Sequence, residues 1–233
     1  MSNVFFESLS TKIINEDFLK TDLIGKESVD LVVTSPPYNV DIKYNSHKDN
    51  LSYKEYIEFS RKWLNKAFSL MKSGGRLCLN VPLDTDKDGK RSIYADLTVI
   101  AKKVGFKYKG TIIWNKQNVK NKYAMVFSKN IEVIIIFYKD EWKPVKKEYM
   151  EWVNETWKFS GENATRMGHP AAFPIELPTR LIKMFSEKED VVLDPFMGSG
   201  TTLVAAKKNE RKGIGVEIDE KYCELARTRS VSI

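Results

Sequence analysis

The segment Thr34-Ser35-Pro36-Pro37-Tyr38 combines a hydroxyl, a rigid backbone and an aromatic ring within five residues. It follows the apolar residues 31–33, and two prolines cannot continue a central strand. We therefore expect a rigid turn at the carboxyl edge of a sheet, where open α/β sheets bind ligands. There the Ser35 hydroxyl and the Pro36 carbonyl could accept the hydrogens of an amino group while Tyr38 stacks on a flat heterocycle. A proline-terminated strand with a core tyrosine is the alternative.

A second segment combines a strand end, a glycine-rich turn and a helix start. An acidic residue follows the apolar run 191–193, and the turn leads into a predicted helix. Its residues are Asp194, Pro195, Phe196, Met197, Gly198, Ser199, Gly200, Thr201 and Thr202. Glycine lets a ligand approach the main chain, and the free N–H groups of a helix start favour an anionic or electron-rich group.

Two common nucleotide fingerprints do not fit this turn. A P-loop requires a lysine where Thr201 stands, and the dinucleotide fingerprint requires a small residue where Leu203 stands. The next predicted strand, 213–217, ends in Glu217, and a carboxylate about 20 residues beyond the turn commonly binds the hydroxyls of a ribose. The pattern predicts a nucleoside ligand without a pyrophosphate. An ordinary strand–helix turn is the alternative.

Short apolar runs alternate with segments of helical period, which predicts an α/β fold with a largely parallel sheet. The expected strands are 29–34, 76–81, 111–114, 131–138, 190–194 and 213–217. The expected helices are 53–71, 93–104, 176–185, 201–208 and 221–229. Near-continuous apolar strands are typical of a sheet that helices cover on both faces.

Composition limits the class of protein. A hydrophobic content of 42% in 233 residues excludes a wholly disordered chain, and we expect one domain over 1–233. No run approaches the roughly 18 apolar residues of a membrane span, and no signal peptide is apparent, so we expect a cytoplasmic protein without a membrane partner. Cys78 and Cys223 have no metal-ligand spacing, so no metal site is predicted.

Together the two segments resemble motif IV and motif I of the S-adenosylmethionine-dependent DNA amino-methyltransferases. Their order is similar to that of the permuted β group, and the resemblance covers nearly the whole chain. It implies a Rossmann-like class I methyltransferase fold with S-adenosyl-L-methionine as cofactor. It also implies catalytic roles for Ser35, Pro36, Pro37 and Tyr38.

The resemblance extends to residues that would contact the cofactor. Asp17, in the segment 13–19, resembles the acid that meets the adenine, and the segment 169–174 resembles the element beside the methionine end. The implied cofactor contacts are Asp17, His169, Phe173, Asp194, Pro195, Phe196, Gly198, Ser199, Gly200, Thr201, Thr202, Glu217 and Ile218.

The implied reaction is site-specific methylation of an exocyclic amine on a base flipped out of double-stranded DNA. It needs no covalent intermediate, and neither cysteine lies in a Pro-Cys nucleophile context. Adenine enzymes of the family mostly carry Asp at the position of Ser35, so we predict N4 of cytosine, with N6 of adenine as the alternative. An amino-methyltransferase acting on RNA or a small molecule, an ATPase and a non-catalytic DNA-binding module are more distant alternatives.

The formal charge of +7 permits a polyanionic partner. Between residues 101 and 122 there is no acid, and seven lysines occur there: Lys102, Lys103, Lys107, Lys109, Lys116, Lys120 and Lys122. We predict that Lys116, Lys120 and Lys122 bind DNA phosphates, which supplies affinity without sequence choice. A solvated helix face and a charged hairpin are the alternative.

Residues 139–168 contain Trp142, Trp152 and Trp157 without a sustained period. We predict a small target-recognition insert, the alternative being a surface excursion that packs its tryptophans into the core. The insert is short for enclosing duplex DNA from both sides, so we expect a homodimer. A cognate restriction endonuclease would act as a separate protein.

Overall fold

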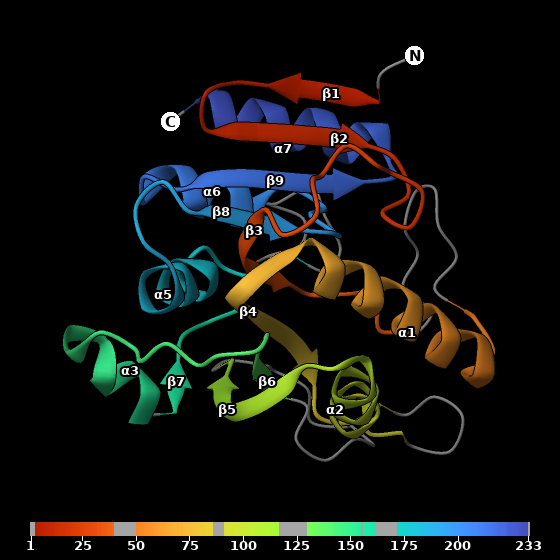
Figure 1. The fold of residues 1–233 in the computed structure, drawn as a ribbon, viewed down its shortest axis with the longest axis vertical. Coiled ribbons are helices and arrows are strands. Elements are labelled where there is room, and N and C mark those ends of the chain that lie inside the picture. Colours follow the sequence, from red (N-terminus) through yellow and green to blue (C-terminus); the bar gives the residue numbers. More distant parts are fainter. Residues whose placement is uncertain are drawn as a thin grey trace.

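A nine-stranded sheet forms the centre of the computed structural model, which describes residues 3–39, 50–85, 91–116, 130–154, 156–161 and 172–232 (Figure 1). Its strands are β1 (Val4–Glu7), β2 (Thr11–Asn15), β3 (Val29–Thr34), β4 (Met71–Pro82), β5 (Lys107–Asn115), β6 (Ile131–Tyr138), β7 (Trp157–Lys158), β8 (Val191–Asp194) and β9 (Lys212–Glu217). Its helices are α1 (Tyr53–Leu70), α2 (Ile93–Val104), α3 (Met150–Asn154), α5 (Glu176–Phe185), α6 (Thr201–Lys208) and α7 (Glu220–Val231), and a short 3₁₀ turn, η1 (Lys147–Tyr149), precedes α3.

The sheet order is β1-β2-β9-β8-β3-β4-β6-β5-β7. The five neighbouring strands from β2 to β4 are parallel, β1 is antiparallel to β2, and β6 is antiparallel to both β4 and β5. The predicted largely parallel α/β sheet is therefore confirmed. Because the carboxyl ends of parallel strands meet at one edge, the segments that follow β2, β3, β8 and β9 are brought together there.

Helices cover both faces of the sheet (Figure 1). Alternation along β3 directs Val32 to the core beneath α1 and α2, whereas Leu31 and Val33 face the core beneath α5 and α6. Trp63 of α1 is fully buried in the first of these cores. The expected helices 93–104, 176–185 and 201–208 coincide with the observed α2, α5 and α6.

Local chemistry fixes where the helices begin. Ser52 and Glu55 form a reciprocal capping box at the start of α1, and the Asp219 carboxylate caps α7. Helix α6 is different: its N-cap residue, Gly200, lies in the left-handed region at φ 76°, where glycine carries no steric cost. The chain can therefore turn directly from β8 into α6.

The strands β1, β2 and β7 were not predicted because each is short and carries little periodic signal. Strand β7 pairs with β5 and brings Trp157 into the core, fully buried, so the described part of the segment 139–168 contributes to the sheet. Within the described ranges, no helix combines the length and apolarity needed to cross a bilayer.

Candidate active site

A cavity of about 180 Å³ opens at the carboxyl edge of the parallel strands and brings both chemical segments together. Its wall comes from the residues after β2, β3, β8 and β9, with contributions from α1 and α7. The lining residues are Glu16, Asp17, Phe18, Ser35, Pro36, Pro37, Tyr38, Phe59, Ala172, Phe173, Pro195, Phe196, Met197, Gly198, Ser199, Thr201, Val216, Glu217, Ile218 and Tyr222.

The Asp194 carboxylate connects the two segments beneath this cavity. Its Oδ1 accepts hydrogen bonds from Thr34 Oγ1 at 2.8 Å and from the Phe196 N–H at 3.1 Å, and its Oδ2 accepts one from Thr202 Oγ1 at 2.7 Å. Burial raises the pKa of Asp194 to about 6, although all three hydrogen bonds favour the ionised form. Asp194 thus fixes the end of β3 to the glycine turn.

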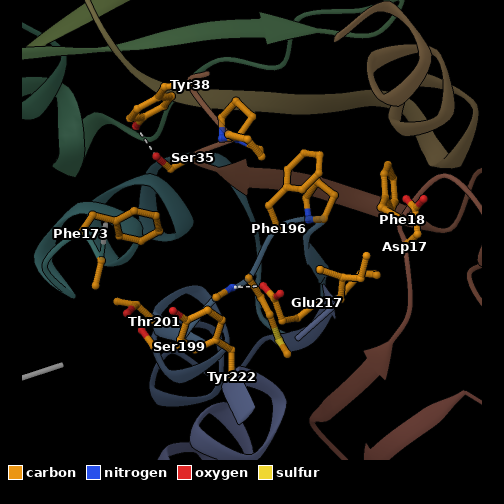
Figure 2. A pocket seen from close by; sticks show the side chains of 18 of the residues that line it. Asp17, Phe18, Ser35, Tyr38, Phe173, Phe196, Ser199, Thr201, Glu217 and Tyr222 are labelled. Atoms are coloured by element: carbon orange, nitrogen blue, oxygen red, sulfur yellow. Dashed lines mark hydrogen bonds between the residues drawn. The ribbon is translucent and has the colours of Figure 1, made fainter. Parts of the chain in front are cut away.

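Glu217 closes the turn from the next strand. Its Oε2 accepts from the Gly198 N–H at 3.0 Å (Figure 2), and its Oε1 accepts from the Asp219 N–H at 2.9 Å. Burial is also the main cause that raises the pKa of Glu217. The carboxylate keeps acceptor capacity for a hydroxyl from a ligand.

Aromatic rings form the opposite side of the cavity from the Ser-Pro-Pro-Tyr turn. Figure 2 shows Asp17 and Phe18 on one side, Ser35 and Tyr38 on the other, and Phe196 between them. Phe196 is held edge-on by Phe18, with ring centroids 6.1 Å apart, and by Trp63 at 5.5 Å. This apolar wall, flanked by the carboxylates of Asp17 and Glu217, suits a flat ring joined to a sugar.

Ser35 and Tyr38 are hydrogen-bonded to each other through their hydroxyls (Figure 2). Tyr38 Oη also donates to the backbone oxygen of Asn80, the tenth residue of β4, at 2.9 Å. The two prolines between them hold this pair at the end of β3. The two hydroxyls therefore line the cavity on a rigid backbone.

Three predicted cofactor residues lie outside the cavity lining. Asp194 is 1% exposed, and Thr202 is committed to its carboxylate. Gly200 begins α6, where a Cβ would lie 2.6 Å from the Ala226 Cβ. These residues build the turn and are not among the residues that line the cavity, and their direct contact with the cofactor stays a prediction. His169 lies outside the described residues.

Several lining residues were missed by sequence reasoning. Phe18 lies within the segment that indicated Asp17, and Tyr222 lies in the first turn of the helix after Glu217, so proximity to those acids was the available signal. Arg229 of α7 carried no such signal. Its guanidinium donates to the Ser199 carbonyl at 2.6 Å and to Thr201 Oγ1 at 3.2 Å, which braces the turn from outside.

The fold places the two ends of the lysine-rich stretch at opposite ends of strand β5. Asn115 pairs with Ile131 near the cavity edge, whereas Lys107 pairs with Tyr138 at the far edge. Lys102, Lys103, Lys107 and Lys109 therefore lie away from the cavity. Lys116 is at the cavity edge, but its Nζ binds Glu132 Oε1 at 2.7 Å. Lys120 and Lys122 lie outside the described residues.

The part of the chain that the structure describes contains no group of three His, Cys, Asp or Glu side chains that could hold a metal ion. Both cysteines are buried, and burial raises the pKa of Cys223 to about 12. Neither thiol is suited to act as a nucleophile.

Comparison with known proteins identifies the family. A family model described as DNA methylase, of the N6/N4 methyltransferase group, matches residues 29–228. The chain belongs to the N6/N4 DNA methylases. The expected class of enzyme, an S-adenosylmethionine-dependent DNA amino-methyltransferase, is confirmed.

Two curated relatives of this DNA methylase are type II methyltransferases. M.MjaVI of Methanocaldococcus jannaschii is 46% identical over 168 residues, which cover 65% of this chain and 86% of the relative. M.HpaI of Haemophilus parainfluenzae is 30% identical over 225 residues, which cover 88% of this chain and 69% of the relative.

Two solved structures show the same fold. PvuII DNA methyltransferase (cytosine-N4-specific) gives a TM-score of 0.81 at 23% identity, covering 98% of this methylase and 89% of that chain. A Thermus thermophilus protein, solved in complex with S-adenosyl-L-methionine, gives a TM-score of 0.71 at 28% identity, with 96% and 95% covered. The expected Rossmann-like methyltransferase fold is confirmed.

Proposed function

We propose that this DNA methylase transfers the methyl group of S-adenosylmethionine to N4 of a cytosine flipped out of double-stranded DNA. The observation that carries the proposal is the shared cavity. Ser35 and Tyr38, which suit a planar amine, line the same space as the glycine turn and Glu217, which suit a nucleoside.

The cavity fits the cofactor in its donors and its walls. Glu217 would accept the ribose hydroxyls, Asp17 the adenine amino group, and Phe196 would contact the adenine ring together with Ile218, which is 52% exposed beside the cavity. Ser199, Thr201 and Phe173 would face the methionine end. When bound, the cofactor supplies a methyl group on a positively charged sulfur, which keeps the electron pair of the broken carbon–sulfur bond.

The residues of the Ser-Pro-Pro-Tyr turn would orient the amine. Ser35 Oγ and the Pro36 carbonyl accept its two hydrogens, which favours a pyramidal nitrogen with its lone pair aimed at the methyl carbon. The ring of Tyr38 stacks on the flipped base. The new carbon–nitrogen bond uses that lone pair, and the nitrogen then loses one proton to solvent. No strong base is required.

The choice of cytosine rests on Ser35. A neutral hydroxyl stands where most adenine enzymes of the resembled family carry an aspartate. N6 of adenine is the second candidate, because both amines offer the same two hydrogens to the same acceptors. We also propose that the enzyme acts as a homodimer and that a restriction endonuclease, where present, is a separate protein.

The test uses duplex DNA and cofactor labelled in the methyl group. After incubation, the DNA is digested to nucleosides and separated by chromatography, and we expect label in N4-methylcytosine. Label only in N6-methyladenine would refute the cytosine assignment. Transfer to RNA but not to DNA would refute the DNA substrate. Sequencing that reports modified bases, applied to DNA from expressing cells, would give the sequence context.

A pair of variants checks the assigned roles. Tyr38→Ala removes the stacking ring, so transfer should be lost while cofactor affinity, measured by calorimetry, is kept. Asp194→Ala releases the glycine turn, so both should fall. Tyr53→Ala is the matched control, because Tyr53 is 44% exposed and its hydroxyl binds Asp96 on α2. Equal losses of cofactor affinity at Tyr38 and Asp194 would contradict these roles.

A further inference from the structure

A chain of polar contacts runs from the cavity into the sheet and ends at a charged pair. Ser35 bonds to Tyr38, Tyr38 bonds to Asn80, and Asn80 Nδ2 donates to Glu132 Oε2 at 2.6 Å. Glu132 in turn binds Lys116. Asn80 is 2% exposed and the Glu132 side chain 14% exposed, so these contacts are largely shielded from water.

The number of hydroxyl protons fixes which group donates in each hydrogen bond of this chain of contacts. The hydroxyl of Tyr38 has one proton, and it donates that proton to the Asn80 backbone oxygen. The hydrogen bond between the two hydroxyls must therefore be donated by Ser35. The lone pairs of Ser35 Oγ are then left to accept, which is what the substrate amine requires.

Glu132 fixes the orientation of the Asn80 amide. A carboxylate oxygen accepts only from the NH₂ side of an amide, so Glu132 prevents the amide from flipping. The same NH₂ group lies 3.4 Å from Tyr38 Oη, and it thereby presents a donor, not an acceptor, to Tyr38. A flipped amide would offer Tyr38 a second acceptor, and the proton of Tyr38 would no longer be committed to the Asn80 backbone.

We infer that Glu132 is a positioning residue for methyl transfer: it acts through Asn80 and Tyr38 to keep Ser35 an acceptor. The inference rests on the proposed function and adds residues that do not touch the substrate. The chain orients protons and does not conduct them, because the side-chain NH₂ group of Asn80 is a donor toward both Glu132 and Tyr38.

Lys116 completes the arrangement by neutralising Glu132. An unpaired carboxylate this shielded would be costly, and the 2.7 Å contact with Lys116 Nζ compensates its charge. This gives Lys116 a role in the active site, and its predicted phosphate contact stays a prediction.

The experiment measures steady-state methyl transfer to duplex DNA, and separately cofactor affinity and thermal stability, for Tyr38→Phe, Glu132→Gln and the double variant. Tyr38→Phe keeps the stacking ring and removes the acceptor for the Ser35 proton. Glu132→Gln cannot accept from Asn80 and Lys116 at once without turning an NH₂ group toward one of them. The controls are Tyr53→Phe and Glu224→Gln, because Tyr53 binds Asp96 and Glu224 binds Arg227, both at exposed positions.

We expect Tyr38→Phe to lower kcat about tenfold, and Glu132→Gln about threefold to tenfold, with KM for DNA, cofactor affinity and melting temperature as in the wild type. The double variant should be no slower than Tyr38→Phe, because both substitutions disturb one chain.

If the wild type methylates DNA, three results would overturn the inference. The first is a kcat of the variants equal to that of the controls, and the second is an additive loss of kcat in the double variant. The third is a loss of kcat that parallels a loss of cofactor affinity or of melting temperature. A wild-type enzyme that methylates no DNA would instead refute the proposed function, and this inference with it.

Discussion

At the scale of single residues, the buried carboxyl of Asp194 couples the two chemical segments. Thr34 and Asp194 are 160 positions apart in the chain, yet their side chains are 2.8 Å apart. The residue after Thr34 is Ser35, and the turn after Asp194 lines the cofactor side of the cavity. One carboxylate therefore sets the distance between the groups that hold the amine and those that hold the methyl donor.

This carboxyl predicts a pH dependence of stability. Because its pKa in the folded protein, about 6, exceeds the ordinary 3.8, its stabilising contribution is complete below the unfolded pKa and is lost as pH rises through 6. Asp194→Asn removes this loss. Between about pH 5 and pH 7.5, the free energy of unfolding of the wild type should fall relative to Asp194→Asn by about 1 kcal/mol. Urea denaturation across this range measures it, with exposed Asp22→Asn as control, and parallel curves would contradict the prediction.

At the scale of elements, the junction of β8 and α6 depends on a backbone that only glycine adopts without cost. Gly200 has φ 76° and lies against Ala226 of α7. Arg229, also on α7, holds the Ser199 carbonyl. Helix α7 thus shapes the cofactor side of the cavity from behind the turn.

Gly200→Ala should therefore destabilise the protein and weaken cofactor binding. The positive φ alone costs about 1–2 kcal/mol for alanine, and the 2.6 Å approach to the Ala226 Cβ adds to it. Gly110→Ala in β5 is the control, because a Cβ there meets nothing within 4 Å. Denaturation and calorimetry should show losses only for Gly200→Ala. Similar values for both variants would mean that the turn tolerates a side chain.

At the scale of the whole molecule, the positive charge of +7 is not concentrated in one place. A stretch that looks continuous in sequence passes from the far edge of the sheet, at Lys107, to the cavity edge, at Lys116. Because DNA must reach the cavity, lysines at the far edge should contribute little to its binding.

This division predicts the salt dependence of DNA affinity. Each lysine that neutralises a phosphate adds about 0.9 to the slope of log affinity against log salt. Lys120→Gln/Lys122→Gln should lower that slope by about 2, whereas Lys102→Gln/Lys103→Gln should leave it unchanged. Fluorescence anisotropy between about 50 and 200 mM salt makes the comparison at equal loss of charge. An equal fall of the slope in both double variants would show that DNA affinity depends on the net charge and not on where the lysines lie.

The predicted target-recognition insert carries the last prediction. Residues 139–168 are short for enclosing duplex DNA from a second side. A homodimer would supply that side. Sedimentation at micromolar concentration should give the mass of two chains, and a monomer both with and without DNA would refute the dimer.

Local patterns in the sequence predict the two chemical segments and most of the elements. Prolines after an apolar run and glycines after an acid constrain the backbone locally, so both segments and elements such as 93–104 and 131–138 could be predicted from neighbours in the chain. Strand order is not encoded in such local patterns. Only the tertiary structure joined Thr34 to Asp194, paired Lys116 with Glu132 and placed Asn80 beneath Tyr38, because these contacts depend on which strands lie side by side.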